Sequence, residues 1–318
     1  MTALDIHQAI TDQIVAAIEA GAPDFKMPWH RSHGSLMRPM NVSSGNAYQG
    51  VNILSLWVAA ECKGFTAPVW GTYRQWLAKG AQVRKGEKAS LVVFYKELDF
   101  ARENAETGET EEGKTLFARA SHVFNAAQVD GFALPEPEGT PRTLIESLDA
   151  AEALMRATGI TTHEGGERAF YRPSDDTITM PDRWRFTGSD TMTPQEAFYA
   201  TWLHEGIHAS GAKHRLDRDL ANRFGSAAYA FEELIAELGA SYLCADIGIT
   251  TDLRPDHAAY IATWLKVLKD DKKAIFTAAS QADKAARYIL GFNSDAPTPT
   301  RPESPSPDAP PDEADALR

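Results

Sequence analysis

Cysteine is scarce in this sequence of 318 residues, and long apolar runs and a basic leader are absent. Its two cysteines, Cys62 and Cys244, lie far apart in apolar surroundings, which predicts buried free thiols and no disulfide. No apolar run reaches the roughly 18 residues that a membrane-spanning helix needs. The first residues carry acidic side chains and lack the basic region of a secretory signal. These absences exclude a disulfide-stabilised secreted protein and a helical membrane protein, and they predict a soluble, cytoplasmic protein with no membrane partner.

Charge is divided unevenly along the chain. Residues 1–96 contain ten Lys and Arg against six Asp and Glu, whereas the remainder contains 22 against 38. The first part therefore carries a net charge of +4 and the rest a net charge of −16. This asymmetry indicates that only the first part binds a polyanion, while the acidity of the rest leaves mimicry of DNA as an alternative.

The length of the chain and one proline-rich stretch predict two domains. LPEPEGTPR, residues 134–142, is the expected linker between domains at residues 1–133 and 143–293. Residues 294–318 contain seven prolines and few apolar side chains, so we expect a disordered tail. The predicted fold class is α+β, with an N-terminal α+β domain and a mostly helical C-terminal domain.

Periodic apolar positions mark the expected helices, and β-branched and aromatic runs mark the expected strands. In the N-terminal domain we expect helices over 3–20, 52–64 and 70–80, strands over 89–100 and 116–132, and an acidic hairpin loop over 103–114. In the C-terminal domain we expect helices over 143–159, 193–211 and 229–248, one or two more over 256–291, and a hairpin over 168–182. The helix after Thr193 has a proline at its first position and Glu196 at the capping-box distance.

The segment HEGIH, residues 204–208, places two histidines one turn apart on the same face of a helix. Both rings can then bind one Zn²⁺ at about 2.0–2.1 Å, with Glu205 as the general base for a metal-bound water. The alternative is a pair of histidines on a solvent-exposed helix edge. The surrounding helix is apolar, and burying two unpaired histidines would be costly. We therefore predict a zincin-type centre with His204 and His208 as ligands, for Zn²⁺ or alternatively Mn²⁺.

The third ligand has two candidate sources. Gly211 and His214 complete the longer metzincin pattern, but that pattern also needs a methionine downstream, and no methionine follows the motif. The gluzincin pattern instead takes a glutamate from the next helix. We assign Glu233 as the ligand and Glu237 as the residue that holds a ligand histidine through its other ring nitrogen, with the reverse assignment left open. Glu232 fits a solvated helix charge best, and His214 is expected near the mouth of the site or on the surface.

The N-terminal domain combines aromatic, amide and basic side chains. Proteins bind single-stranded nucleic acid with aromatic faces that stack on bases and with cations that follow the backbone. Tryptophans usually belong to cores, so composition alone is a weak signal. The candidate DNA-binding residues are Arg38, Asn41, Tyr48, Asn52, Trp70, Tyr73, Trp76, Arg84, Lys85 and Lys88.

Three segments, in this order, resemble the ArdC family of antirestriction proteins: RPMNVSSGNAYQGVNIL, WGTYRQWLAKGAQVRKGEKASLVVFYK, and HEGIHASGAKHRLDR followed by YAFEELIAELGASYL. The resemblance extends over about residues 5–292. It implies an N-terminal domain that binds single-stranded DNA and a C-terminal zincin-like metallopeptidase domain. It also implies protection of incoming plasmid DNA from host restriction during conjugation. The position of His214 usually carries a small polar residue in that family, which favours Glu233 as the third ligand.

The leading hypothesis is therefore an antirestriction protein with single-stranded DNA as its partner. A host restriction enzyme or another protein is a candidate substrate of the metal domain. The alternative is an active zinc metallopeptidase that cleaves a host protein and uses its N-terminal domain only for targeting. A structural role for the zinc and a primase accessory role are weaker options. Three protein ligands leave the fourth metal position open, which favours a catalytic arrangement.

Overall fold

The structure is a computed structural model, and it describes residues 5–22, 27, 29, 37–103, 110–134, 143–220, 226–252 and 260–292. Within β4 and β5 the side chains of residues 96–103 and 110–117 are left aside. The predicted tail at 294–318 and all of the predicted linker except Leu134 lie outside the described residues.

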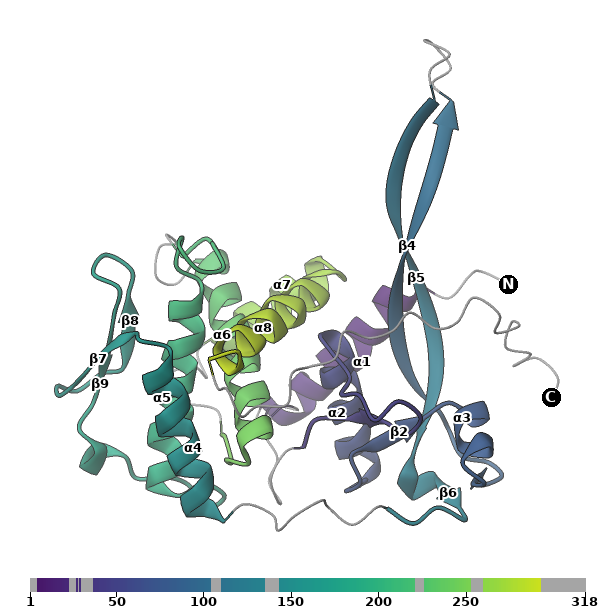
Figure 1. The fold of residues 1–318 in the computed structure, drawn as a ribbon, viewed down its shortest axis with the longest axis horizontal. Helices are drawn as coiled ribbons and strands as arrows, with labels where there is room; N and C mark the ends of the chain where they lie inside the picture. Colours follow the sequence, from purple (N-terminus) through teal and green to yellow (C-terminus); the bar gives the residue numbers. More distant parts are fainter. Residues whose placement is uncertain are drawn as a thin grey trace.

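The elements confirm the α+β class (Figure 1). The helices are α1 (Ile6–Gly21), α2 (Val51–Lys63), α3 (Tyr73–Ala78), α4 (Leu144–Ala157), α5 (Pro194–Ser210), α6 (Ala227–Ile247), α7 (Ile261–Asp270) and α8 (Ala274–Leu290), with short 3₁₀ turns η2 (Ala126–Gln128) and η3 (Arg183–Arg185). The strands are β1 (Met40–Asn41), β2 (Val69–Gly71), β3 (Gln82–Val83), β4 (Ser90–Glu103), β5 (Thr110–Asn125), β6 (Val129–Asp130), β7 (Thr161–Glu164), β8 (Phe170–Arg172) and β9 (Thr177–Met180).

The N-terminal half is built on a sheet of strand order β1-β2-β5-β4. The antiparallel ladder of β4 and β5 runs from Ser90↔Val123 to Glu103↔Thr110, and Figure 1 shows it as a long twisted ribbon that projects from the body. The predicted acidic loop over 103–114 is therefore wrong in extent, because Thr110 to Lys114 pair with β4. A continuous ladder satisfies the backbone groups that a loop would leave to water.

Helix α2 covers the outer edge of β4. The amide of Asn52 donates to the Val93 carbonyl oxygen at 2.7 Å and accepts from the Val93 N–H at 2.8 Å. These two bonds replace a neighbouring strand, since an edge strand otherwise leaves its N–H and C=O groups unpaired. The helix ends at Gly64, whose φ of 66° is left-handed, as the sequence predicts for a glycine that closes a helix.

The C-terminal half contains helices α4 to α8 and a small sheet of order β7-β9-β8. The hairpin of β8 and β9 is confirmed, whereas β7, which pairs parallel to β9, was not expected. Helix α5 starts with the predicted capping box. The Thr193 hydroxyl accepts from the Glu196 N–H at 3.2 Å, and the Glu196 carboxylate accepts from the Thr193 N–H at 2.9 Å.

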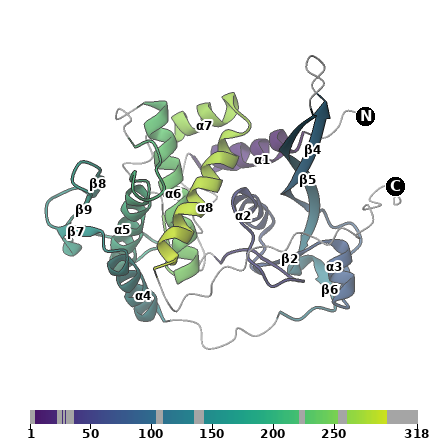
Figure 2. The same cartoon turned by 45° about the horizontal axis from the view of Figure 1, so that its top comes forward.

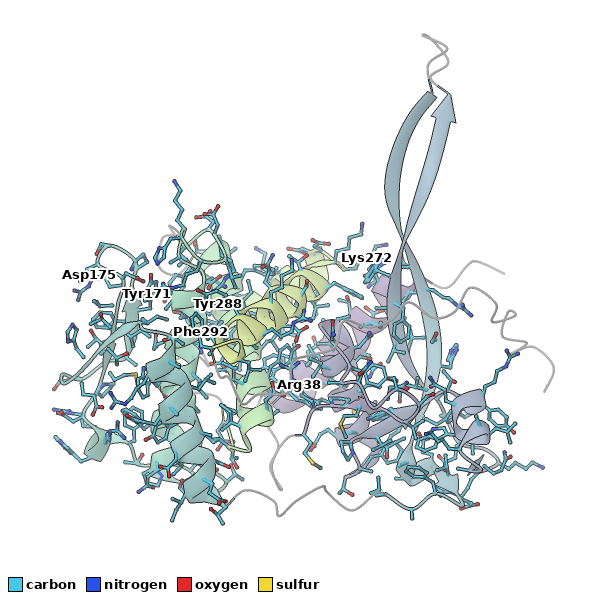
Figure 3. All side chains as sticks on the ribbon, viewed as in Figure 1. Arg38, Tyr171, Asp175, Lys272, Tyr288 and Phe292 are labelled. Carbon is cyan, nitrogen blue, oxygen red and sulfur yellow. The ribbon has the colours of Figure 1, made fainter. Side chains whose placement is uncertain are left out.

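The two halves share one hydrophobic core. In Figure 2, α1 and α2 lie against α7 and α8, and the buried cluster includes residues of all four helices. Polar contacts cross the same boundary. Arg38, labelled in Figure 3, forms ion pairs of 2.8 Å with Asp246 of α6 and with Asp283 of α8. The Tyr242 hydroxyl of α6 donates to the Gly50 carbonyl oxygen at 3.3 Å.

The two cysteines differ in their exposure to solvent. Cys244 is buried as predicted, but Cys62 is exposed near the end of α2, so the prediction of a buried thiol there is wrong. Its position in the last turn of α2 explains the difference, because residues 51–60 of this helix are buried whereas residues 61–63 are all exposed. None of the helices in the described part of the chain combines the length and the apolar character needed to span a bilayer.

Candidate metal centre

The packing of α5 against α6 brings three metal-binding side chains together. His204 and His208 lie one turn apart on α5, and their Nε2 atoms are 3.1 Å from each other. Glu233 of α6 places its Oε2 atom 3.4 Å from His204 Nε2 and 3.6 Å from His208 Nε2. Three donor atoms thus form a small triangle that points toward one position.

The size of this triangle fits a tetrahedral metal ion. A Zn²⁺ ion bound at about 2.0–2.1 Å by four ligands holds neighbouring donor atoms about 3.3 Å apart. The three donor separations of 3.1, 3.4 and 3.6 Å lie around that value. Two imidazoles and a carboxylate also suit Zn²⁺ and Mn²⁺ by ligand type. Among the described residues, His204, His208 and Glu233 form the group of His, Cys, Asp or Glu side chains whose donor atoms lie close enough together to hold one metal ion.

Burial makes the site electrostatically unusual. His204, Glu205 and Glu233 are 3%, 3% and 4% exposed. Burial lowers the pKa of His208, but the carboxylates of Glu233 and Glu232 outweigh this effect and raise the pKa to about 10. Burial likewise raises the pKa of Glu233, and the two histidines overcome it and hold that pKa well below its usual range. The buried carboxylates therefore stabilise a positive charge at this site.

Glu232 has a different environment from the one predicted. The sequence suggests a solvated helix charge, yet Glu232 is only 8% exposed, and its Oε1 lies 3.2 Å from His208 Nδ1. The prediction fails because α6 is buried on several sides, packing against α5, α7 and α8. Glu237, predicted to hold a histidine, lies with its Oε1 3.7 Å from His204 Nδ1.

His214 lies outside the donor triangle. Its side chain is 63% exposed, and its Nε2 is 3.4 Å from Asp176 Oδ2 in the turn between β8 and β9. The structure thus places it on the surface, which is one of the two locations predicted. Tyr229, which is not among the residues predicted for the site, hydrogen-bonds to Glu233; burial and this bond raise the pKa of Tyr229 above its usual range. Its spacing of four residues before Glu233, one turn of α6, is the signal that could have found it.

Five of the candidate DNA-binding residues lie inside the protein. Trp76 is 0% exposed and its indole N–H donates to the Phe124 carbonyl oxygen at 3.0 Å, while Trp70 is 1% exposed. Tyr48 and Asn52 are 5% and 7% exposed, and Arg38 is engaged by two aspartates. These side chains hold the fold together in this structure, and contact with DNA would require the domain to open.

The exposed candidates gather on α3 and on the turn that precedes β4. Tyr73 is 47% exposed, and its hydroxyl accepts from Gln82 Nε2 at 2.8 Å. Arg84, Lys85 and Lys88 are exposed in the turn after β3, with Arg84 paired to Glu87 at 2.8 Å. Asn41 is half-buried, and its side-chain oxygen accepts from the backbone N–H groups of residues 43 and 44. The exposed cations Arg74 of α3 and Lys79, the residue directly after this helix, were not among the candidates, although they lie in the same segment.

The HExxH helix, the glutamate from the following helix and the buried donor triangle define a zincin-like metal site. Comparison with known families agrees, since residues 149–281 match the zincin-like metallopeptidase family MPTase-PolyVal. Residues 4–124 match the family described as the N-terminal domain of anti-restriction factor ArdC. The chain belongs to the ArdC family of antirestriction proteins.

Solved structures and curated relatives support this assignment. The metal-free crystal structure of the antirestriction ArdC protein from plasmid R388 is 39% identical, with a TM-score of 0.73 over 91% of this chain and 98% of that one. Its Mn(II)-bound structure is 38% identical, with a TM-score of 0.71 over 92% of this chain and 99% of that one. Zn²⁺, with Mn²⁺ as an alternative, therefore fits the site both by donor geometry and by family.

Among curated proteins, y4eC of Sinorhizobium fredii (strain NBRC 101917 / NGR234) is 50% identical over 298 residues, covering 93% of this chain and 94% of y4eC. A DNA primase TraC of Escherichia coli is 37% identical over 302 residues, which is 90% of this chain but 20% of the primase. The chain thus spans about a fifth of the length of that primase.

Proposed function

We propose that this protein binds single-stranded DNA through its N-terminal half and protects incoming plasmid DNA from host restriction. The observation that carries the proposal is the cluster of exposed aromatic and basic residues on α3, at its C-terminal end and in the β3–β4 turn: Tyr73, Arg74, Lys79, Arg84, Lys85 and Lys88. An exposed aromatic ring next to cations suits a nucleic-acid strand, because the ring stacks on a base and the cations neutralise phosphates. Membership of the ArdC family supports the same reading.

The distribution of charge supports a local contact. The protein carries a net charge of −12, so a polyanion is repelled by the molecule as a whole. Residues 1–96 carry +4, and the exposed cations of α3 and the turn belong to this part. Binding should therefore depend on few ionic contacts and weaken as salt is added, with a slope set by the number of phosphates that these cations neutralise.

For the metal half we propose that His204, His208 and Glu233 hold a Zn²⁺ or Mn²⁺ ion and that Glu205 is the general base. A divalent ion bound there would act as a Lewis acid and lower the pKa of a bound water. Glu205 follows His204 on the same helix and is buried, which suits it to accept a proton in a water-poor site. Three protein donors leave a coordination position open for water or substrate.

This open arrangement favours a second candidate function, a metallopeptidase that cleaves a host protein. In that case the N-terminal half delivers the enzyme to its target. A peptidase would need Glu205 to accept a proton from the attacking water and return it to the leaving amine.

The first experiment measures binding of the full chain to labelled single-stranded and double-stranded oligonucleotides across a salt series, with and without a chelator. We expect salt-dependent binding that prefers the single strand and survives the chelator. A charge-reversed variant, Lys85→Glu with Lys88→Glu, should bind more weakly at low salt, whereas Lys266→Glu with Lys284→Glu, at exposed positions of α7 and α8, serves as the charge-matched control. Absence of binding at every salt concentration rejects the DNA-binding proposal.

The second experiment separates the two functions. Plasmid transfer into a restricting host is scored with wild-type protein and with Glu205→Gln, which keeps the size of the side chain and removes the base. Unchanged protection means that peptide hydrolysis is not needed. Loss of protection with DNA binding retained supports the metallopeptidase.

A further inference from the structure

Behind the donor triangle, Arg218, Glu232 and His208 form a buried chain of contacts. Glu232 Oε1 lies 3.2 Å from His208 Nδ1. Arg218 donates to both oxygens of Glu232, from Nε to Oε2 at 3.1 Å and from Nη2 to Oε1 at 2.8 Å. The Arg218 and Glu232 side chains are 6% and 10% exposed, so water competes little for these bonds. The carboxylate is thus held in one orientation, facing the histidine.

We propose that Glu232, fixed by Arg218, is a positioning residue that prepares His208 for the metal. A neutral imidazole carries one N–H, and an ionised carboxylate only accepts hydrogen bonds. Beside Glu232, the proton of His208 belongs on Nδ1, which leaves the Nε2 lone pair facing His204 and Glu233. The inference rests on the ligand set proposed above, and it assigns a role to a residue that the sequence reading treats as a surface charge.

Arg218 is itself built into the end of α5. Its Nη2 donates to the Ile207 carbonyl oxygen at 2.6 Å, and its Nη1 donates to the Ser210 hydroxyl at 3.0 Å. A Cβ at position 211 would come within 2.8 Å of Arg218 Nη2, so the glycine there makes room for the guanidinium. Arg218 therefore ties the last turn of the histidine helix to the glutamate helix α6, and this fixes the distance from His208 to Glu232.

Glu232 and Glu237 lie at different distances from the two ligand histidines. His204 Nδ1 lies 3.7 Å from Glu237 Oε1, which is longer than a normal hydrogen bond, whereas His208 Nδ1 lies 3.2 Å from Glu232. The Glu232 carboxylate also accepts hydrogen bonds from two nitrogens of the Arg218 guanidinium, which fix its orientation. Loss of the Glu232 carboxylate should therefore weaken metal binding more than the same change at Glu237.

The test measures Zn²⁺ affinity of the full chain by competition with a chromophoric chelator. Loss of an outer carboxylate of this kind weakens metal binding about 10–100-fold, and we expect that range for Glu232→Gln. Arg218→Met should also weaken Zn²⁺ binding. The double variant should be no weaker than Glu232→Gln alone, because Arg218 acts through Glu232. The absorption spectrum of the Co²⁺-loaded protein should also change in both single variants, which a purely structural role would not cause.

Controls separate this inference from the ligand set and from folding. Glu196→Gln removes another buried carboxylate, at the far end of α5, and should leave Zn²⁺ affinity unchanged. His208→Ala should abolish tight binding; if it does not, the ligand set itself is wrong. If His208→Ala loses the metal while folded Glu232→Gln stays within about twofold of wild type with an unchanged Co²⁺ spectrum, the positioning role is rejected. Should Glu232→Gln fail to fold by circular dichroism, Arg218→Lys decides by the same two measurements.

Discussion

Exposure divides the aromatic side chains of α3 into two kinds that should respond differently to mutation. Trp76 is fully buried, donates to a backbone carbonyl and packs edge-on against Phe132 with ring centroids 4.9 Å apart. Tyr73, three residues earlier on the same helix, is 47% exposed. Helix α3 therefore packs one aromatic ring, Trp76, in the core and exposes another, Tyr73, to solvent.

We expect Trp76→Ala to lower the free energy of unfolding by about 3–5 kcal/mol, because it leaves a large cavity and an unpaired carbonyl. Tyr73→Ala should change that free energy by less than about 1 kcal/mol and instead weaken single-stranded DNA binding, where one stacked base contributes about 1–3 kcal/mol. Urea denaturation and fluorescence anisotropy measure the two quantities. A Tyr73→Ala protein with wild-type DNA affinity would contradict the stacking role.

The Glu196 carboxylate makes the stability of the protein depend on pH. Burial raises its pKa, but bonds from the N–H groups of Thr193 and Thr250 outweigh burial and hold the pKa below its usual value of 4.5. A carboxyl whose pKa is lower in the folded state stabilises the protein above its unfolded pKa, and this contribution is lost as the pH falls below it.

We therefore expect Glu196→Gln to cost about 0.5–2 kcal/mol at pH 7, the range for a lost helix cap. The difference from wild type should shrink as the pH is lowered from about 5 toward 3. Thermal unfolding of both proteins across this range measures the difference. A gap that stays constant with pH would show that folding does not shift the pKa of this carboxyl.

At the scale of the elements, glycine sets how closely the two metal-bearing helices approach. A Cβ on Gly239 of α6 would lie 2.8–3.0 Å from three side-chain atoms of Ile207, the residue before His208. A Cβ on Gly206 of α5 would instead meet the flexible end of Met155 at 2.8 Å, away from α6. The first contact involves a branched side chain beside the site, and the second a side chain that can move.

Gly239→Ala should therefore destabilise the protein by about 1–3 kcal/mol through overpacking and also weaken Zn²⁺ binding, because it pushes the helices apart at His208. Gly206→Ala is the matched control and should cost less, with metal affinity retained. Calorimetry and chelator competition measure both effects. Equal metal affinities in the two variants would show that the spacing of α5 and α6 at this point does not control the site.

The sequence predicts elements well where one helix face or one cap decides them. The repeat of Ile6, Ile10, Ile14 and Ile18 gives α1, and the HEGIH spacing gives the two histidines. Contacts between distant segments are invisible to such patterns, which is why the Asn52–Val93 pairing and the Arg218–Glu232 pairing were missed. For α6 the reason is geometric: neighbours on several faces bury charged residues that periodicity assigns to solvent.

At the scale of the whole molecule, ion pairs join segments that the sequence assigns to different domains. Arg38 is 11% exposed and bridges Asp246 and Asp283, while the Gly50 N–H at the start of α2 donates to Asp283 at 3.3 Å. The hydrophobic cluster continues through the same region. Both halves should therefore unfold together.

Arg38→Met should destabilise the protein by about 1.5–3 kcal/mol, because the buried Asp283 loses its buried cation and keeps only the partly exposed Arg287 as an ion-pair partner. Unfolding of the wild type should follow one transition, with tryptophan fluorescence and far-ultraviolet circular dichroism coinciding. Arg172→Met, which removes an exposed pair with Asp175, is the control and should change little. Two separate transitions in the wild type would contradict the shared core.

The core that α1 and α2 share with α7 and α8 also bears on how such a gene can be inherited. A recombination breakpoint between residues 134 and 142 looks harmless in the sequence, since it falls in a proline-rich stretch. Each product, however, would present the bare inner surfaces of two helices, beginning with Ile10, Ile14 and Ile18 on one side and Leu268 and Ile275 on the other. Selection against such aggregation-prone pieces would keep the two halves together as a single hereditary unit.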